Sequence, residues 1–304
     1  MANLSDKRRR SRGLHRYSTG DFFFDLFVAI FMIVVAVCSF YPFLYILFYS
    51  LSNVAMINTP LLFWPKGFTV EAYKLLLSDS TVPHAFLISV LRTLITPVCN
   101  LFVCLLAAFA LSHQHFPGRG FFQKFITITM YFSAGMIPSY ILMVRLHLTN
   151  SFLVYVIPGL FSVFNMIMIK TYIESIPPAL EESAMIDGAG YFKVLFRVIL
   201  PLLKPVLAAL FLFMCVGQWN TYADTLLYNA GNKDLHTLSY VLMNFIQQST
   251  STAEQARERV GLNTVNTTSL KMSMTVLVVI PIMCVYPTLQ KYFASGLMIG
   301  SIKG

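Results

Sequence analysis

The sequence has few charged side chains. Only 12% of its 304 residues are Asp, Glu, Lys or Arg, whereas an average soluble domain carries roughly a quarter. Hydrophobic residues make up 57% of the chain. So few polar side chains cannot cover the surface of a soluble globule of this length. The composition therefore predicts a protein embedded in a membrane.

The sequence also lacks paired cysteines and catalytic motifs. Its cysteines are odd in number, show no Cys-x-x-Cys spacing and lie in apolar stretches, so we predict neither disulfides nor a cysteine metal site. His113 and His115 have no neighbouring carboxylate or cysteine to complete a metal site. We find no nucleophile elbow, zinc-protease helix or phosphate-binding glycine loop. The chain is thus predicted not to be an enzyme and to hold no cofactor, and any energy source must lie in another protein.

Long apolar segments dominate the rest of the chain. About 20 residues of helix cross a hydrocarbon core about 30 Å thick. None of the segments has the strict alternation of a barrel strand, so helices are expected. We therefore predict an all-α polytopic membrane protein with six transmembrane helices. The expected spans are Phe22–Leu51, Ala85–Ser112, Phe122–Val144, Ser151–Ile173, Leu203–Tyr222 and Met272–Phe293.

Basic residues predict the orientation. The run Lys7-Arg-Arg-Arg-Ser-Arg12 directly precedes the first span, and positive loops remain on the cytoplasmic side. Six spans return the C-terminus to that side, so we expect a multi-pass protein of the plasma membrane with both termini in the cytoplasm. A basic tail could also bind nucleic acid, but this run ends at a membrane span, and no nucleic-acid partner is predicted.

One charged segment, residues 177–201, interrupts the apolar chain. Pro177 and Pro178 end the fourth span, and the residues from Ala179 to Asp187 favour a short helix. Glycines then permit a sharp turn, and a second amphipathic helix is expected to end at Pro201. Taken by themselves, these residues fit equally a socket for a soluble partner and an ordinary loop lying on lipid headgroups.

The segment resembles the EAA loop of binding-protein-dependent ABC importer permeases. That loop reads Glu-Ala-Ala, three residues, Gly, nine residues, Ile, one residue, Leu-Pro. Here Glu182-Ser183-Ala184 is followed at those spacings by Gly188, Val198 and Leu200-Pro201, with Ser183 and Val198 as small departures. The segments Gln290–Gly304, Pro65–Tyr73 and Gln218-Trp219-Asn220 resemble the second permease subunit of maltose-type carbohydrate importers, and most closely oligosaccharide permeases of Gram-positive bacteria.

The resemblance implies a type I ABC importer permease fold and a division of the chain. Residues 1–20 would be a cytoplasmic tail, 21–84 the first transmembrane helix with an outer segment, 85–293 the permease core with its coupling loop at 177–201, and 294–304 a second cytoplasmic tail. Coupling to the ATPase would involve Glu181, Glu182, Ser183, Ala184, Asp187, Gly188, Leu200 and Pro201. The tail residues Gly300, Lys303 and Gly304 would reach the ATPase interface, unless they form only a frayed terminus.

The resemblance also implies partners and a mechanism. They are a second homologous permease subunit, two cytoplasmic ABC ATPase subunits that hold ATP and Mg²⁺, and an extracellular sugar-binding lipoprotein that delivers a carbohydrate. ATP binding in the partners would drive alternating access. Asn229, Asn232 and Asp234, in the outer segment 225–266, would contact the binding protein, whereas the later part of that segment could be a simple spacer.

Polar and aromatic side chains inside the spans are candidates for the sugar path, because aromatic faces and amide groups bind sugars. The first candidates are Gln218, Trp219, Asn220 and Tyr222, followed by Tyr131, Asn100 and Asn165. Each could equally be a contact between helices. Arg92 is interpreted as snorkelling to the outer interface. A stand-alone secondary transporter or channel is the alternative. It predicts intramembrane ionisable residues for ion coupling or inverted repeats with broken helices, and we find no pair of intramembrane carboxylates.

Overall fold

The computed structural model describes residues 19–247 and 265–296, with side chains from 22 to 247 and from 265 to 285. These residues form helices and contain no β-strand, so the predicted all-α class is confirmed for them. Four helical segments are long and apolar enough to cross a membrane: Phe22–Ser50, Thr81–Ser112, Tyr191–Asn220 and Thr267–Val285. The first, second and fourth belong to the helices α1 (Thr19–Ser50), α3 (Thr81–Ser112) and α13 (Thr267–Gly296), and the third ends with α9 (Leu200–Asn220).

The fourth expected span is bent. It consists of the 3₁₀ turns η2 (Phe152–Tyr155) and η3 (Ile157–Gly159) followed by α6 (Val163–Glu174), and its two parts meet at 47°. Ser162 begins α6 as an N-cap, because its side chain accepts a hydrogen bond from the backbone N–H of Asn165. This pair of segments counts as a fifth crossing only when it is taken as one broken span.

The third expected span, Phe122–Val144, is not one helix. It is divided into α4 (Arg119–Thr129) and α5 (Met136–Arg145), so the described residues confirm four or five spans and not the predicted six. Gly135 stands at the break with φ = +84°, a left-handed conformation that ends any continuing right-handed helix. Pro138, in the first turn of α5, has no N–H to continue a helix from the preceding residues.

The second half of the charged segment is continuous with the fifth span. The helix α8 (Tyr191–Val194) leads through the π-helical turn η4 (Leu195–Ile199) directly into α9, so Pro201 does not end a helix as predicted. A proline ring normally clashes with the carbonyl four residues earlier. Here the preceding turn is wide, with the N–H of Leu200 donating to the carbonyl of Leu195, and a π-turn of this kind accommodates the proline.

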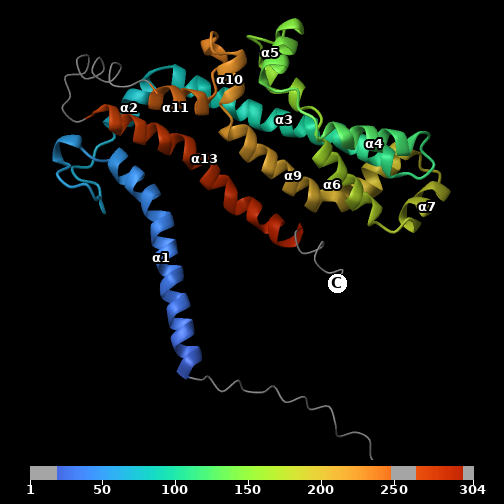
Figure 1. The fold of residues 1–304 in the computed structure, drawn as a ribbon, viewed down its shortest axis with the longest axis horizontal. Helices are drawn as coiled ribbons and strands as arrows, with labels where there is room; N and C mark the ends of the chain where they lie inside the picture. The colour runs from blue at the N-terminus through green and yellow to red at the C-terminus, as the bar shows by residue number, and fades with distance from the viewer. Residues whose placement is uncertain (1–18, 248–264, 297–304) are drawn as a thin grey trace, which may run out of the picture.

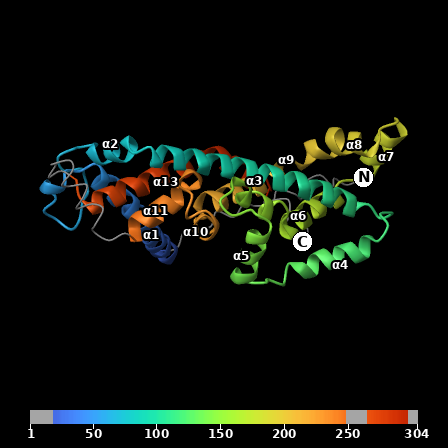
Figure 2. The ribbon, with the colours of Figure 1, turned by 90° about the horizontal axis from the view of Figure 1, so that it is seen from above.

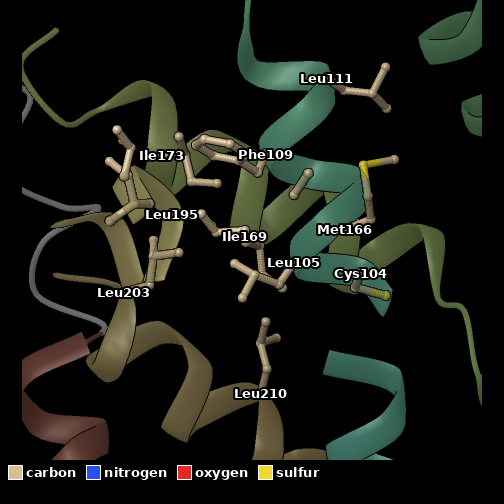
Figure 3. Close-up of a cluster of buried hydrophobic side chains, with 13 residues drawn as sticks. Cys104, Leu105, Phe109, Leu111, Met166, Ile169, Ile173, Leu195, Leu203 and Leu210 are labelled. Atoms are coloured by element: carbon tan, nitrogen blue, oxygen red, sulfur yellow. The ribbon is translucent and has the colours of Figure 1, made fainter. Parts of the chain in front are cut away.

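Three helices form the inner core. The helix α3 packs against both α6 and α9, and side chains of these helices and of α8 and η4 form one apolar cluster (Figure 3). Because lipid is as apolar as these side chains, close packing rather than expulsion of water holds the helices together. The labelled side chains in Figure 3 are Cys104, Leu105, Phe109, Leu111, Met166, Ile169, Ile173, Leu195, Leu203 and Leu210.

A second apolar cluster occupies the other end of the bundle. There α13 packs against α9, and the short helices α2 (Glu71–Ser78) and α11 (Leu238–Gln247) lie beside it (Figure 1). The remaining connections at this end are η1 (Val54–Met56), α10 (Ala223–Tyr228) and η5 (Lys233–Leu235). Ser50 and Tyr73 join α1 to α2 through a 2.6 Å hydrogen bond between their hydroxyls. Burial raises the pKa of Tyr73, which keeps its phenol protonated.

The first helix is an arm. It contacts α13 and then diverges from the bundle toward its N-terminal end (Figure 1). None of the most apolar 18-residue stretch of Phe22–Ser50 is buried within the chain. The large apolar side chains of α1 therefore face lipid or another protein.

Candidate functional site

The coupling segment stands at one end of the molecule. Figures 1 and 2 show α7 (Ala179–Ile186) at the opposite end from α2 and α11. Pro178 is the N-cap of α7, and its carbonyl accepts from the N–H groups of Glu181 and Glu182. The predicted short helix and glycine turn are therefore present, and α7 packs against α8 and η4.

Gly188 ends α7 in a Schellman motif. Its N–H donates to the carbonyl of Met185, and the N–H of Ala189 donates to that of Ala184. Gly188 itself has φ = +81°, which costs a residue with a Cβ atom roughly 1–2 kcal/mol. The glycine is thus required by the backbone, and it fixes the direction in which the chain leaves α7.

The two adjacent glutamates of α7 differ. The carboxylate of Glu181 contacts His113 at the end of α3, whereas that of Glu182 is exposed and makes no ion pair within the described residues. Beside it, Ile186 is 86% exposed and Leu180 is 44% exposed. A free carboxylate next to exposed apolar side chains, on a helix with a fixed end, is typical of a surface that another protein covers.

The other coupling candidates are dispersed around this surface. Ser183 is exposed and donates to the carbonyl of Leu180, and Ala184 packs against the inner core. Asp187 is the exposed C-cap of α7. Leu200 and Pro201 instead lie in the continuous helix that follows, where Leu200 packs against the inner core.

A second contact joins α3 and α6 at the ends that lie near α7. The guanidinium of Arg119 donates to the carbonyl of Leu111, at 2.9 Å, and to the carboxylate of Glu174, at 2.7 Å. The side chain of Lys170 is only 8% exposed, and its ammonium group donates to the same carboxylate at 2.8 Å. Both cations are therefore held at this end by one acidic side chain.

Arg92 is the centre of a buried polar cluster in the half of α3 that lies away from α7. Its side chain is 1% exposed, so the snorkelling interpretation was wrong. Its guanidinium donates to Gln218 at 2.7 Å, to the carbonyl of Thr221 at 3.2 Å and to the carboxylate of Asp224. It also lies 4.7 Å above the centre of the Tyr155 ring. This one side chain links α3 to η2, α9 and α10.

Polar residues of α3 stabilise the bent fourth span. Thr96, Asn100 and Cys104 follow one another at helical spacing and donate to the carbonyls of Tyr155, Gly159 and Ser162. These carbonyls belong to the irregular backbone of the bend, where a helix would have satisfied them. The spacing of four residues between polar side chains on an apolar helix was the signal in the sequence that could have revealed this contact.

The candidates for the sugar path separate into two groups. Trp219 is buried and donates to the carbonyl of Val278 on α13 at 3.0 Å, and Gln218 is held by Arg92. Both therefore make contacts between helices, as do Asn100 and Asn165, whose amide groups bond at 2.9 Å. Asn220 and Tyr222 remain exposed, and so does Tyr131 at the break between α4 and α5.

The outer loop offers fewer contacts than expected. Asn229 is fully buried and donates to the carbonyl of Ser151, so it is closed to an external protein. Asn232 caps η5 by accepting from the N–H of Asp234, whose own side chain is exposed. The later part of the loop, 248–264, and the tail residues Gly300, Lys303 and Gly304 lie outside the described residues. Within the described part, no group of three metal-ligating side chains occurs.

Comparison with known proteins places this geometry among transport proteins. No family model matches the chain. It is 30% identical over 282 residues to the polygalacturonan/rhamnogalacturonan transport system permease protein YtcP of Bacillus subtilis, covering 92% of this chain and 98% of the relative. It is 34% identical over 282 residues to the protein LplC of the same organism, covering 92% and 95%.

A solved structure agrees with these relatives. The chain is similar to the crystal structure of a bacterial ABC transporter involved in the import of the acidic polysaccharide alginate, with 31% identity and a TM-score of 0.83. The match covers 91% of this chain and 99% of that one. The likeness thus extends over nearly the whole length of both chains.

Proposed function

The chain belongs to the permease family of carbohydrate ABC importers, and we propose that it forms part of the membrane pathway by which an oligosaccharide enters the cell. It is a transport subunit, and ATP hydrolysis belongs to partner ATPases. The observation that carries the proposal is α7, a helix with a fixed glycine end that displays Glu182 and Ile186 to an absent partner. A rigid helix of this kind can transmit a rigid-body movement of a partner to α8 and α9.

In this proposal the chain crosses the plasma membrane six times. The divided segments α4 and α5 together supply the crossing that the four long helices and the bent pair leave open. Both termini and α7 then lie in the cytoplasm, which agrees with the basic run before α1. The expected division into tails, outer segment and core follows from the same topology.

Each proposed partner is assigned to one part of the chain: the end with α7, the opposite end, or the helix α1. One of two ABC ATPases, which would hold ATP and Mg²⁺, docks at α7, and the tail residues 300–304 reach the interface between the two ATPases. A second permease subunit packs against α1, whose apolar side chains are uncovered by this chain. A sugar-binding lipoprotein approaches the outer end, where Asp234 and Asn232 are nearest to the surface among the predicted contacts.

We propose oligosaccharides that carry uronic acid groups as the first substrates to examine. Two of the similar proteins are described as transporters of polygalacturonan or rhamnogalacturonan and of the acidic polysaccharide alginate. Within this chain, Asn220 and Tyr222 are the exposed members of the predicted sugar path. They combine an amide with an aromatic face, as sugar binding requires.

A stand-alone secondary transporter remains the alternative. Its expected ionisable pair near the membrane exists in Arg92 and Asp224. Arg92 already supplies the countercharge of Asp224, however, and its guanidinium is held in place by Gln218 and by the carbonyl of Thr221. The pair is better explained as a fixed link between helices.

The test is reconstitution of the chain with its genomic neighbours, namely the second permease, the ATPase and the binding protein, in liposomes. Uptake of oligogalacturonides and ATP hydrolysis stimulated by the loaded binding protein are measured. Glu182→Lys should abolish most of both activities, because it reverses the free charge of α7. Glu71→Lys makes the same substitution on α2 at the other end, where Glu71 forms only a surface pair with Lys74, and should leave both activities nearly unchanged. Wild-type activity of Glu182→Lys, or failure of any ATPase to co-purify, would favour the stand-alone transporter.

A further inference from the structure

His113 joins three helices at the base of the coupling segment. It is the residue that follows the last turn of α3, and its Nδ1 lies 2.7 Å from the carbonyl oxygen of Phe109. Its Nε2 lies 2.5 Å from Oε1 of Glu181 on α7. The ring also meets the Tyr191 ring of α8 edge to face, with centroids 5.5 Å apart. No other described side chain ties α7 to α3 by an ion pair.

The two partners of the imidazole determine how many protons the contact must hold. A carbonyl oxygen and an ionised carboxylate both only accept hydrogen bonds, and a neutral imidazole carries only one N–H. With neutral His113 and ionised Glu181, one ring nitrogen would therefore point its lone pair at an oxygen. The observed geometry requires one further proton, carried by the ring or shared with the carboxylate.

The surroundings favour the doubly protonated ring. A cation near the carbonyls at the end of α3 and a carboxylate in the first turn of α7 each oppose the charge of a helix end. The titratable groups that face the ring are Glu181 from α7 and Tyr191 from α8, with His115 next in the connecting loop. A cavity of about 550 Å³, lined by His113, His115 and Phe192 among others, adjoins the ring and leaves it open to exchange of protons.

We propose that His113 is a positioning residue for coupling: its doubly protonated ring holds α7 against α3, and loss of one of its two N–H protons releases that helix. This inference rests on the proposed function. The sign follows from the contact, because raising the pH removes the proton that the contact requires.

The experiment compares three forms of the reconstituted transporter across about pH 6 to 8.5. His113→Arg keeps a cation with several N–H donors at every pH in this range, and His113→Phe keeps the ring packing but has no donor. Activity is stimulated ATP hydrolysis with oligogalacturonide-loaded binding protein. Dividing each value by that of His113→Arg at the same pH removes the pH dependence of the ATPase itself.

We expect the wild-type ratio to fall about two- to fivefold as the pH rises, a size appropriate to a half-exposed ion pair, and the His113→Phe ratio to be low and flat. Deuterium uptake of the peptide 179–187 supplies a measure that needs no transport. This peptide has the same sequence in all three forms, so their uptake can be compared directly at one pH. Wild-type uptake should resemble that of His113→Arg at low pH and that of His113→Phe at high pH.

The outcomes separate the two proposals. Stimulated ATP hydrolysis with a flat wild-type ratio would overturn the role of His113 and leave the importer function standing. Peptide uptake that changes with pH while the activity ratio stays flat would overturn it as well, because the contact would then be without effect on coupling. Absence of stimulated hydrolysis in all three forms would overturn both. A falling wild-type ratio together with matching peptide uptake supports both.

Discussion

The two ends of α3 carry ion pairs of different character. Near the outer end, Arg92 is 1% exposed and bonds to groups of α9, α10 and their connection. At the inner end, His113 and Glu181 are each 23% exposed and join α3 to the single short helix α7. Asp224 is as exposed as His113 and Glu181, so the two contacts differ in the full burial of Arg92 and in its several partners. A buried cation with several partners resists separation, whereas one partly exposed pair is broken at smaller cost. The outer end is thus built as a fixed frame and the inner end as an adjustable contact.

This difference suits a helix that must relate movement at one end to a pathway at the other. His113 follows Arg92 by 21 positions, which corresponds to about 30 Å along a helix. A docked ATPase can pull on α7 only if α7 is free to shift, and the shift is useful only if the far end remains fixed. The predictions below test each half of this contrast.

The largest loss of stability is expected from Arg92→Leu. This change removes the cation beside Asp224, which is 23% exposed, and leaves Gln218 and the carbonyl of Thr221 without their donor, so we expect a loss of about 3 kcal/mol. Thermal unfolding of the purified protein in detergent measures the loss. Arg145→Leu is the control, because Arg145 is exposed at the end of α5. Equal melting temperatures for the two variants would mean that the outer cluster is not a fixed frame.

A smaller and more local effect is expected from Gly188→Ala. The left-handed conformation of Gly188 makes a Cβ unfavourable by roughly 1–2 kcal/mol, although no atom lies within 4 Å of its position. Stimulated ATP hydrolysis should fall while the melting temperature stays within about a degree of wild type, because the strain is confined to the exposed end of α7.

Gly190 provides the matched control for that variant. It also has open space around its Cβ position, but its φ of −73° suits any residue. Gly190→Ala should therefore retain wild-type hydrolysis. If both alanine variants lose activity equally, the surface near the turn matters for docking and the backbone conformation of Gly188 does not.

Much of the architecture could be predicted from the sequence, because long apolar runs and proline-glycine punctuation act locally. The helices α1, α3 and α13 and the coupling helix α7 were expected near their observed positions. The division of the third expected span at Gly135 was not predicted, because the segment is apolar on both sides and a single glycine is the only sign of the break. Continuation through Pro201 was missed because a π-turn depends on the packing of neighbouring helices.

The polar contacts were harder to predict for a related reason. Arg92 meets its partners across more than 120 positions of sequence, and their proximity is a consequence of the fold. A single intramembrane arginine therefore fits snorkelling and burial equally well until the helices are placed. Glu181 and Glu182 are likewise neighbours in sequence with opposite environments, because only one of them faces the end of α3.

The smallest loss of stability is expected from Arg119→Leu. This variant tests whether the contribution of an arginine depends on its burial or on its place along the bundle. Arg119 resembles Arg92 in binding one main-chain carbonyl and one carboxylate, but its side chain is 28% exposed and Glu174 retains Lys170 as a partner. We therefore expect a loss of at most about 1 kcal/mol in thermal unfolding, and no change in the pH profile of hydrolysis, because arginine stays charged throughout. A loss as large as that of Arg92→Leu would show that the inner end is as rigid as the outer one. The adjustable contact would then be confined to His113 and Glu181, since α3 and α6 would move as one body.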